Sequence, residues 1–309
     1  EFLNLGVVVI DEQHRFGVLQ RELLTQKGLC PHKLIMTATP IPRSLALTLY
    51  GDLNVSLLDE MPPGRQPIAT RVFYGNHREQ AYQTVREQIA LGRQAYVVCP
   101  LIEETEKMDL KTVLEVQKQL QQAFPDLNIG LMHGKMKKEE RDAQMKAMSQ
   151  NKIQCLIATT VVEVGIDIPN ATIMLIENAE RFGLTQLHQL RGRTGRGVEQ
   201  SYCILVKHKS TKDASLRLSI MKKTNDGFKI SDEDLKLRGP GEFFGKRQHG
   251  YIKMKIGNIL TDGSIIREAR KVAFSIIDKD PHLLKPGNKR IRKQFIQEYS
   301  EMLEFVNIS

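Results

Sequence analysis

The segment QLHQLRGRTGRG spans Gln186–Gly197 and sets two arginines, Arg193 and Arg196, three residues apart among glycines. A guanidinium group is permanently charged, and its planar fork can hold phosphate oxygens at two points, which suits the stabilisation of a phosphoryl group in transfer. A solvated basic loop would have the same composition. The motifs that lie upstream are needed to distinguish the two interpretations.

An apolar run at the start of the chain, Leu5–Ile10, ends in Asp11 and Glu12. Such a run is typical of a buried parallel strand, and acids at its carboxyl end lie where open α/β sheets bind ligands. There Asp11 could hold Mg²⁺ through water, and Glu12 could orient or deprotonate an attacking water. The alternative is a plain strand end before a helix whose first turn favours acids.

The next predicted strand, His32–Thr37, runs into the sequence TATPIPRS, whose prolines end a strand and start a helix. Thr37 and Thr39 would then lie beside the two acids at the same sheet edge. Their hydroxyls could bridge His14 or the acids. Two such strand ends side by side favour a functional site.

A segment rich in proline, DEMPPGRQP at residues 59–67, is the expected linker. After it, strand and helix patterns alternate, which predicts an α/β fold with a parallel sheet covered by helices on both faces. The expected strands are Ile68–Tyr74, Gln94–Cys99, Ile129–His133, Ile153–Ala158, Thr172–Glu177 and Ser201–Val206, and the expected helices are His77–Leu91, Asp109–Ala123 and Met136–Gln150.

The sequence ATTVVEVGIDIP, Ala158–Pro169, follows one of these strands. Hydroxyls and a glycine at a strand-to-helix turn can cradle a phosphate or a sugar. A well-capped, buried helix start explains the same residues, and His133 with its neighbouring glycine reads as a simple turn. The residues that would form the cradle are Thr159, Thr160, Gly165 and Asp167.

Composition narrows the class of protein. The four cysteines are far apart, which argues against a zinc site or a disulfide framework and favours reduced thiols. No apolar run reaches membrane-spanning length and no signal-peptide pattern is present, so we expect a cytoplasmic protein without a membrane partner.

The net charge of +9 lies in residues 201–309, with 22 Lys and Arg against 13 Asp and Glu. This excess suggests a polyanionic partner, although spare surface lysines would give the same count.

The pattern beyond Lys207 is helical. A basic helix, Lys212–Lys223, should be followed by a short helix, Ser231–Leu237, with a serine cap. An irregular loop, RGPGEFFGKRQHG at 238–250, should come next and present Arg238 and Gln248 to a nucleic-acid backbone, or pack around its phenylalanine pair. Two amphipathic helices are expected at Ser264–Ile277 and Lys289–Val306.

Four segments, taken in order, resemble motifs II, III, V and VI of superfamily 2 helicases. They are DEQH (11–14), TATPIPR (37–43), ATTVVEVGIDIP and QLHQLRGRTGRG. The sequence around these motifs is similar to the RecG family of ATP-dependent branch-migration helicases, from Leu5 to about Gly250 and more loosely beyond. It includes ENAERFGLTQLHQLRGRTGRG and DEDLKLRGPGEFFGKRQHG. The transcription-repair coupling factor Mfd shares the motor and is the nearest alternative. A non-catalytic, basic DNA-binding module is a further one.

The resemblance implies RecA-like parallel sheets: the C-terminal part of a first helicase lobe over residues 1–60, a complete second lobe over 61–210, and a helical translocation module over 211–309. It implies Walker B roles for Asp11 and Glu12, with Mg²⁺ held by Asp11 through water, and finger roles for Arg193 and Arg196 at the γ-phosphate of ATP. The other residues implied at the nucleotide are His14, Gln189, Gly165 and Asp167. Those implied to couple the nucleotide to DNA are Thr37, Thr39, Thr159, Thr160, Glu163, Arg238 and Gln248.

The partners that the resemblance implies are branched double-stranded DNA, as in Holliday junctions and replication forks, and single-stranded DNA-binding protein. One departure from the helicase pattern is that the chain contains no G-x-x-x-x-G-K-[ST] phosphate-binding loop. We therefore expect a C-terminal fragment whose intact protein hydrolyses ATP, and which by itself is inactive as an ATPase.

Overall fold

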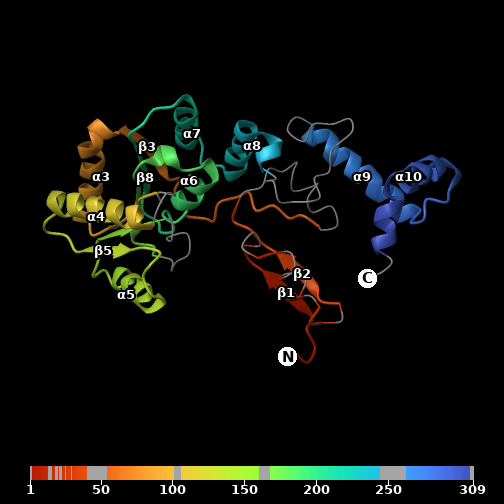
Figure 1. The fold of residues 1–309 in the computed structure, drawn as a ribbon, viewed down its shortest axis with the longest axis horizontal. Helices are drawn as coiled ribbons and strands as arrows, with labels where there is room; N and C mark the ends of the chain where they lie inside the picture. Colours follow the sequence, from red (N-terminus) through yellow and green to blue (C-terminus); the bar gives the residue numbers. More distant parts are fainter. Residues whose placement is uncertain are drawn as a thin grey trace. The chain divides into compact units, whose positions relative to one another are not determined.

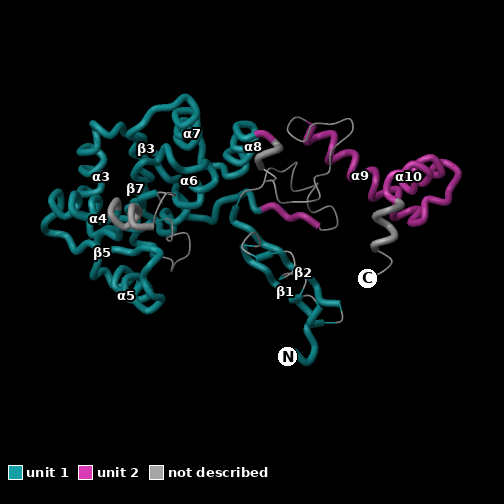
Figure 2. Tube along the Cα trace, in the orientation of Figure 1, with its two compact units in different colours: residues 1–41, 58–238 teal, residues 42–57, 239–309 magenta. Residues whose placement is uncertain are grey.

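The computed structural model describes residues 2–12, 16–17, 20, 23–24, 26–28, 30–39, 54–100, 106–159, 168–243 and 262–306. The chain forms two compact units, one of residues 1–41 with 58–238 and one of residues 42–57 with 239–309 (Figure 2). This division follows contacts within the chain. The helicase-lobe boundaries implied by the resemblance stay a prediction.

The larger unit is built on six parallel strands in the order β3-β8-β7-β4-β6-β5 (Figure 1). Strands β4, β6 and β7 are buried along their whole length, as expected of a parallel sheet with both faces covered. The predicted α/β fold is confirmed. The strands are β3 (Ala69–Tyr74), β4 (Gln94–Val98), β5 (Ile129–Met132), β6 (Cys155–Ala158), β7 (Ala171–Ile176) and β8 (Tyr202–Lys207).

Alternate side chains of the central strands enter two separate cores, because successive residues of a strand point to opposite faces. Tyr96 belongs to one core and Val97 to the other. The Val97 core packs beneath α3 (Arg78–Ala90) and α4 (Glu106–Ala123). The Tyr96 core packs beneath α5 (Lys138–Ser149), α6 (Leu184–Arg191), α7 (Lys212–Lys223) and α8 (Gly227–Phe243).

The strands β1 (Val7–Ile10) and β2 (His32–Ile35) pair in parallel, as the first two apolar runs predicted. The prediction that this first run is buried on both faces is wrong. Val8 is 5% exposed, but Val7 and Val9 are 57% and 56% exposed. In the part of the chain that the structure describes, burial therefore alternates along the uninterrupted apolar run of β1, whereas His32, Lys33 and Leu34 of β2 are all exposed.

Helix α8 begins earlier than predicted. The Asp226 carboxylate accepts hydrogen bonds from the backbone N–H groups of Phe228 and Lys229, at 2.9 and 3.3 Å, and so caps the first turn. Ser231, the predicted cap, lies inside the helix and is 1% exposed. The helix continues to Phe243 across a break at Gly239, where φ is 75°. The loop predicted to begin at residue 238 is therefore helical in its first residues.

The smaller unit contains α9 (Gly263–Lys279), the 3₁₀ turn η5 (Pro286–Asn288) and α10 (Lys289–Val306), close to the predicted bounds. Asp280 ends α9 and closes the turn, since its carboxylate accepts hydrogen bonds from the backbone of Leu284 and Lys285. No helix among the described residues combines the length and apolar character needed to cross a membrane.

Candidate nucleotide and nucleic-acid site

The ends of β1 and β2 meet at one edge. Asp11 and Glu12 directly follow β1, and Glu12 adopts a left-handed conformation with φ of 47°. The Oε2 atom of Glu12 accepts a hydrogen bond of 3.4 Å from the backbone N–H of Ala38, which follows β2. Thr37 Oγ1 accepts a bond of 3.1 Å from the N–H of Thr39. Among the described residues, the two strand ends are thus in contact through a backbone amide. His14 lies outside the described residues.

The carboxylate of Asp11 is exposed at this strand end, and its Oδ1 accepts a hydrogen bond of 2.8 Å from the N–H of Glu12. Within the described ranges, no three His, Cys, Asp or Glu side chains gather as metal ligands. Mg²⁺ usually keeps several waters and takes one or two carboxylates together with substrate phosphates. A single exposed carboxylate at a strand end fits that mode of binding.

Helix α6 carries Gln189 of the QLHQLRGRTGRG segment. Leu187 and Leu190 on one side of the helix are fully buried in the core. Gln189 lies on another side, and its Nε2 donates a hydrogen bond of 2.6 Å to Thr39 Oγ1. This bond connects the segment after β2 with α6, two stretches that are 150 residues apart in the chain.

The turn after α6 holds the two candidate finger residues. Arg193 and Arg196 are both partly exposed, and Arg196 Nε donates a hydrogen bond of 3.4 Å to the carbonyl of Gly192. Gly195 has a φ of 72°, and a Cβ atom there would lie 2.8 Å from Ile68 Cγ1. The turn therefore requires glycine at that position, both for its conformation and for its closeness to Ile68.

Two buried polar atoms lie at the carboxyl end of the six-stranded sheet, Thr159 Oγ1 and His133 Nδ1. Neither has a hydrogen-bond partner among the described residues. The two residues directly follow the neighbouring strands β6 and β5, whose last residues, Ala158 and Met132, are paired. An unsatisfied buried polar group costs about 1–3 kcal/mol. Two of them at the carboxyl edge of a parallel sheet indicate a place for a ligand.

The sequence alone suggests a turn at His133 and Gly134 and does not reveal this pairing. The available signal was the position of His133 at the end of a predicted strand, beside the strand that leads to Thr159. The remaining predicted residues of that segment, Thr160, Glu163, Gly165 and Asp167, lie outside the described residues.

Arg238 is held against the start of α6. Its Nε donates to Asp234 Oδ1 at 3.1 Å, and Asp234 Oδ2 accepts from Thr185 Oγ1 at 3.0 Å. A Cβ atom on Gly183 would lie 2.5 Å from Arg238 Nη2, so the guanidinium group packs on that glycine. The prediction that Arg238 is presented by an irregular loop is therefore wrong. Gln248 lies outside the described residues.

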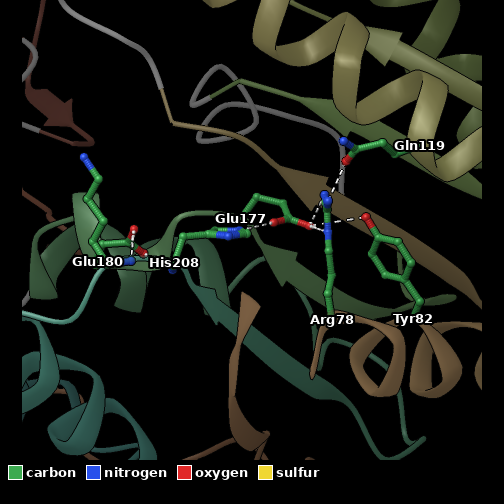
Figure 3. A network of polar contacts seen from close by, with 7 residues as sticks. Arg78, Tyr82, Gln119, Glu177, Glu180 and His208 are labelled. Atoms are coloured by element: carbon green, nitrogen blue, oxygen red, sulfur yellow. Dashed lines mark hydrogen bonds and ion pairs between the residues drawn. The ribbon is translucent and has the colours of Figure 1, made fainter. Parts of the chain in front are cut away.

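A buried carboxylate, Glu177, lies directly after β7 and is 1% exposed (Figure 3). Its Oε1 pairs with Arg78 Nη2 at 2.8 Å and accepts a bond of 3.4 Å from the Tyr82 hydroxyl. Its Oε2 lies 3.3 Å from His208 Nε2, directly after β8. Burial, with the charge of Glu177, raises the pKa of the Tyr82 phenol. Glu177 thus ties together the ends of β7 and β8 and the beginning of α3.

The sequence alone does not identify Glu177 as a site residue. It is one acid at a strand end, and its partners come from α3 and from the residue after β8, so no local pattern reveals them.

Two family models match the chain. Residues 78–198 match the Helicase conserved C-terminal domain, and residues 224–309 match ATP-dependent DNA helicase RecG, domain 3, C-terminal. Curated relatives named ATP-dependent DNA helicase RecG align over nearly the whole chain. The one from Synechocystis sp. is 50% identical over 303 residues, 98% of this chain and 36% of the relative. The one from Bacillus subtilis is 46% identical over 298 residues, 96% of this chain and 44% of the relative.

The chain therefore spans less than half the length of these relatives. Among solved structures, RecG bound to a three-way DNA junction aligns with a TM-score of 0.66 at 44% identity, over 86% of this chain and 34% of that chain. The helicase MrfA bound to DNA and AMPPNP aligns with a TM-score of 0.51 at 18% identity, over 75% of this chain and 36% of that chain, and shares the fold.

Proposed function

The chain belongs to the RecG family of ATP-dependent DNA helicases, and we propose that it forms the C-terminal part of a longer, ATP-driven translocase on branched duplex DNA. Its substrates are Holliday junctions and stalled replication forks, which it branch-migrates and reverses in recombination and repair. Single-stranded DNA-binding protein is a further partner, and the protein acts in the cytoplasm.

The observation that carries this proposal is the hydrogen bond of 2.6 Å between Gln189 and Thr39. Thr39 belongs to the strand-end segment that also contacts the Glu12 carboxylate through Ala38. A translocase needs a physical link between the group that senses the nucleotide and the lobe that carries the finger arginines. These contacts supply such a link from Glu12 to α6.

The nucleotide in this proposal is ATP with Mg²⁺. Asp11 holds the metal through water, Glu12 orients the attacking water, and Arg193 and Arg196 stabilise the charge that develops on the transferring phosphoryl group. His14, Gly165 and Asp167 complete the nucleotide site.

The DNA-facing residues in this proposal are Thr37, Thr39, Thr159, Thr160, Glu163, Arg238 and Gln248. The unsatisfied Thr159 hydroxyl and His133 nitrogen support a phosphate or sugar ligand at the carboxyl edge of the sheet. The family member solved with a three-way DNA junction supports branched DNA as that ligand.

ATP turnover tests the proposal. The full-length protein should hydrolyse ATP in response to branched DNA, whereas the 309-residue chain, which lacks the phosphate-binding loop, should not. Arg196→Ala in the full-length protein should lower turnover by about 10³-fold and leave DNA binding intact. The control is Arg86→Met, an exposed cation of α3. Unchanged turnover in the Arg196 variant would favour a non-catalytic DNA-binding module.

DNA binding tests the second half of the proposal. A branched duplex should bind more weakly as salt rises, because phosphate contacts release counterions. Preference for a junction over a linear duplex of equal length is expected. If the full-length protein instead retains RNA polymerase in a pull-down and shows no preference for junctions, the transcription-repair coupling alternative is the better one.

A further inference from the structure

The last residue of α6, Arg191, is a buried cation with an unusual set of partners. It is 2% exposed. Its Nη1 donates to the backbone carbonyls of Met221 and Thr224, both at 2.9 Å, and to Thr70 Oγ1 at 3.3 Å. Within the described part of the chain, no carboxylate forms an ion pair with it.

A buried charge is costly unless dipoles or an opposite charge replace its water. Here Met221 lies in the last turn of α7 and Thr224 is its C-cap, so the two carbonyls belong to the negative end of that helix. His188 Nδ1 lies 3.1 Å from Arg191 Nη2 and accepts a hydrogen bond from it when the ring is neutral and carries its proton on Nε2. Burial lowers the pKa of Arg191, because the charged guanidinium group loses its surrounding water.

The backbone of the same residue holds the turn that follows. The carbonyl of Arg191 accepts hydrogen bonds from the N–H and the hydroxyl of Thr194, at 3.2 and 3.0 Å. Thr194 is 2% exposed, whereas Arg193 and Arg196 are partly exposed. Within these six residues, buried Arg191 is thus followed by partly exposed Arg193, and buried Thr194 by partly exposed Arg196.

We propose that Arg191 is a positioning residue for Arg193 and Arg196. Its guanidinium group fixes the end of α6 to the end of α7 and to β3, and its carbonyl fixes the turn through Thr194. The two exposed arginines then have one orientation before a nucleotide arrives. This inference rests on the proposed function, since it assigns Arg191 a part in ATP hydrolysis.

The kinetic test uses Arg191→Met and Arg191→Lys in the full-length protein. Methionine keeps the aliphatic stem and removes every donor, while lysine keeps a charge without the planar fork. Misplacing catalytic groups by about 1 Å can cost 10²-fold in rate. We therefore expect kcat for ATP to fall on the order of 100-fold in the methionine variant and less in the lysine variant, with KM changed by less than about threefold. Arg86→Met should match the wild type.

A double-mutant comparison distinguishes the proposed positioning role of Arg191 from a role in stability alone. If Arg191 acts by orienting Arg196, then Arg191→Met should add little to the loss already caused by Arg196→Lys. Multiplicative losses would overturn the proposal. So would a full recovery of kcat on cooling the variant to a temperature at which its far-UV circular dichroism matches the wild type.

Hydrogen exchange on the 309-residue chain gives a readout that does not depend on ATP. Arg191→Met should raise exchange in residues 192–198 and at the end of α7, while α3 stays protected. Unchanged exchange in 192–198 would overturn the proposal. A wild-type protein without DNA-stimulated ATPase would instead refute the proposed function and leave this structural result standing.

Discussion

Arg78 Nη2 lies 2.8 Å from Glu177 Oε1, and the two side chains are 21% and 1% exposed. Gln119 accepts a second bond from the same guanidinium group. The pair joins the first residue of α3 to the end of β7, 99 residues later in the chain. A second pair from the same helix, Arg86 with Asp126, is 3.2 Å long, but both of its side chains are more than half exposed. The two pairs therefore share a chemistry and differ in solvation.

Removing the buried cation should destabilise the larger unit strongly. Arg78→Met leaves the buried Glu177 carboxylate with the Tyr82 hydroxyl and His208 but without its permanently charged partner, and breaking a buried pair in this way costs about 3 kcal/mol. Arg86→Met should cost less than about 1 kcal/mol, because water replaces its partner. Urea unfolding of the 309-residue chain followed by circular dichroism measures both. Equal losses in the two variants would contradict the solvation argument.

The stability of the chain should fall with acid through His188. Burial, and then the charge of Arg191, lower the pKa of His188 from 6.5 to about 4. Between these two values the unfolded chain binds a proton that the native chain does not, so the free energy of unfolding rises with pH across this window. His188→Asn, whose amide oxygen can replace Nδ1 as acceptor, should flatten that part of the profile. Urea unfolding at pH 7, 6 and 5 tests it. Parallel profiles for the two proteins would contradict the assignment.

Thiol labelling should report on burial. Cys99, Cys155 and Cys203 are buried, and burial raises the pKa of each thiol to about 12. Only the thiolate reacts with a disulfide reagent. At pH 8 the native chain should therefore react at exposed Cys30, and all four cysteines should react in denaturant. Mass spectrometry of labelled peptides identifies the sites, and rapid labelling of Cys155 in the native chain would count against the sheet described above.

Replacing Thr159 should separate stability from binding. Its hydroxyl has no partner among the described residues, so Thr159→Val removes an unsatisfied group and should leave the free energy of unfolding unchanged or raise it by up to about 1 kcal/mol. If the hydroxyl contacts DNA, affinity for a branched duplex should nevertheless fall several-fold. The control is Thr84→Val, since that hydroxyl bonds to the carbonyl of Gln80 within α3. A destabilised Thr159 variant would show that the hydroxyl has a structural partner.

Much of the fold could be predicted from local patterns. The strands of the larger unit are short β-branched runs between amphipathic segments, and their pattern alone identifies a parallel sheet. Burial of β1 could not be predicted in the same way. Val7 and Val9 read as core residues, but exposure depends on which elements pack against each face, and that is a property of the tertiary arrangement.

The residues of the candidate site could also be predicted only in part from the sequence. Asp11, Thr39 and Gln189 were identified by motif, and the structure brings Gln189 into contact with Thr39. Arg191 and Glu177 were missed, because their importance comes from partners far away in the sequence. Ser231 was mistaken for a cap because Asp226, five residues earlier, offers the same kind of acceptor to an earlier turn.

The pairing of β3 with β8 has a consequence for biosynthesis. Ala69 is paired with Tyr202, so the first strand of the six-stranded sheet finds its neighbour only after the last strand has been made. At about 5–20 residues per second on the ribosome, β3 waits several seconds or longer with an unpaired edge. A nascent chain stalled before Tyr202 therefore displays both edges of β3 to chaperones and to other nascent chains, whereas synthesis beyond Lys207 supplies β8, which pairs with β3 and with β7.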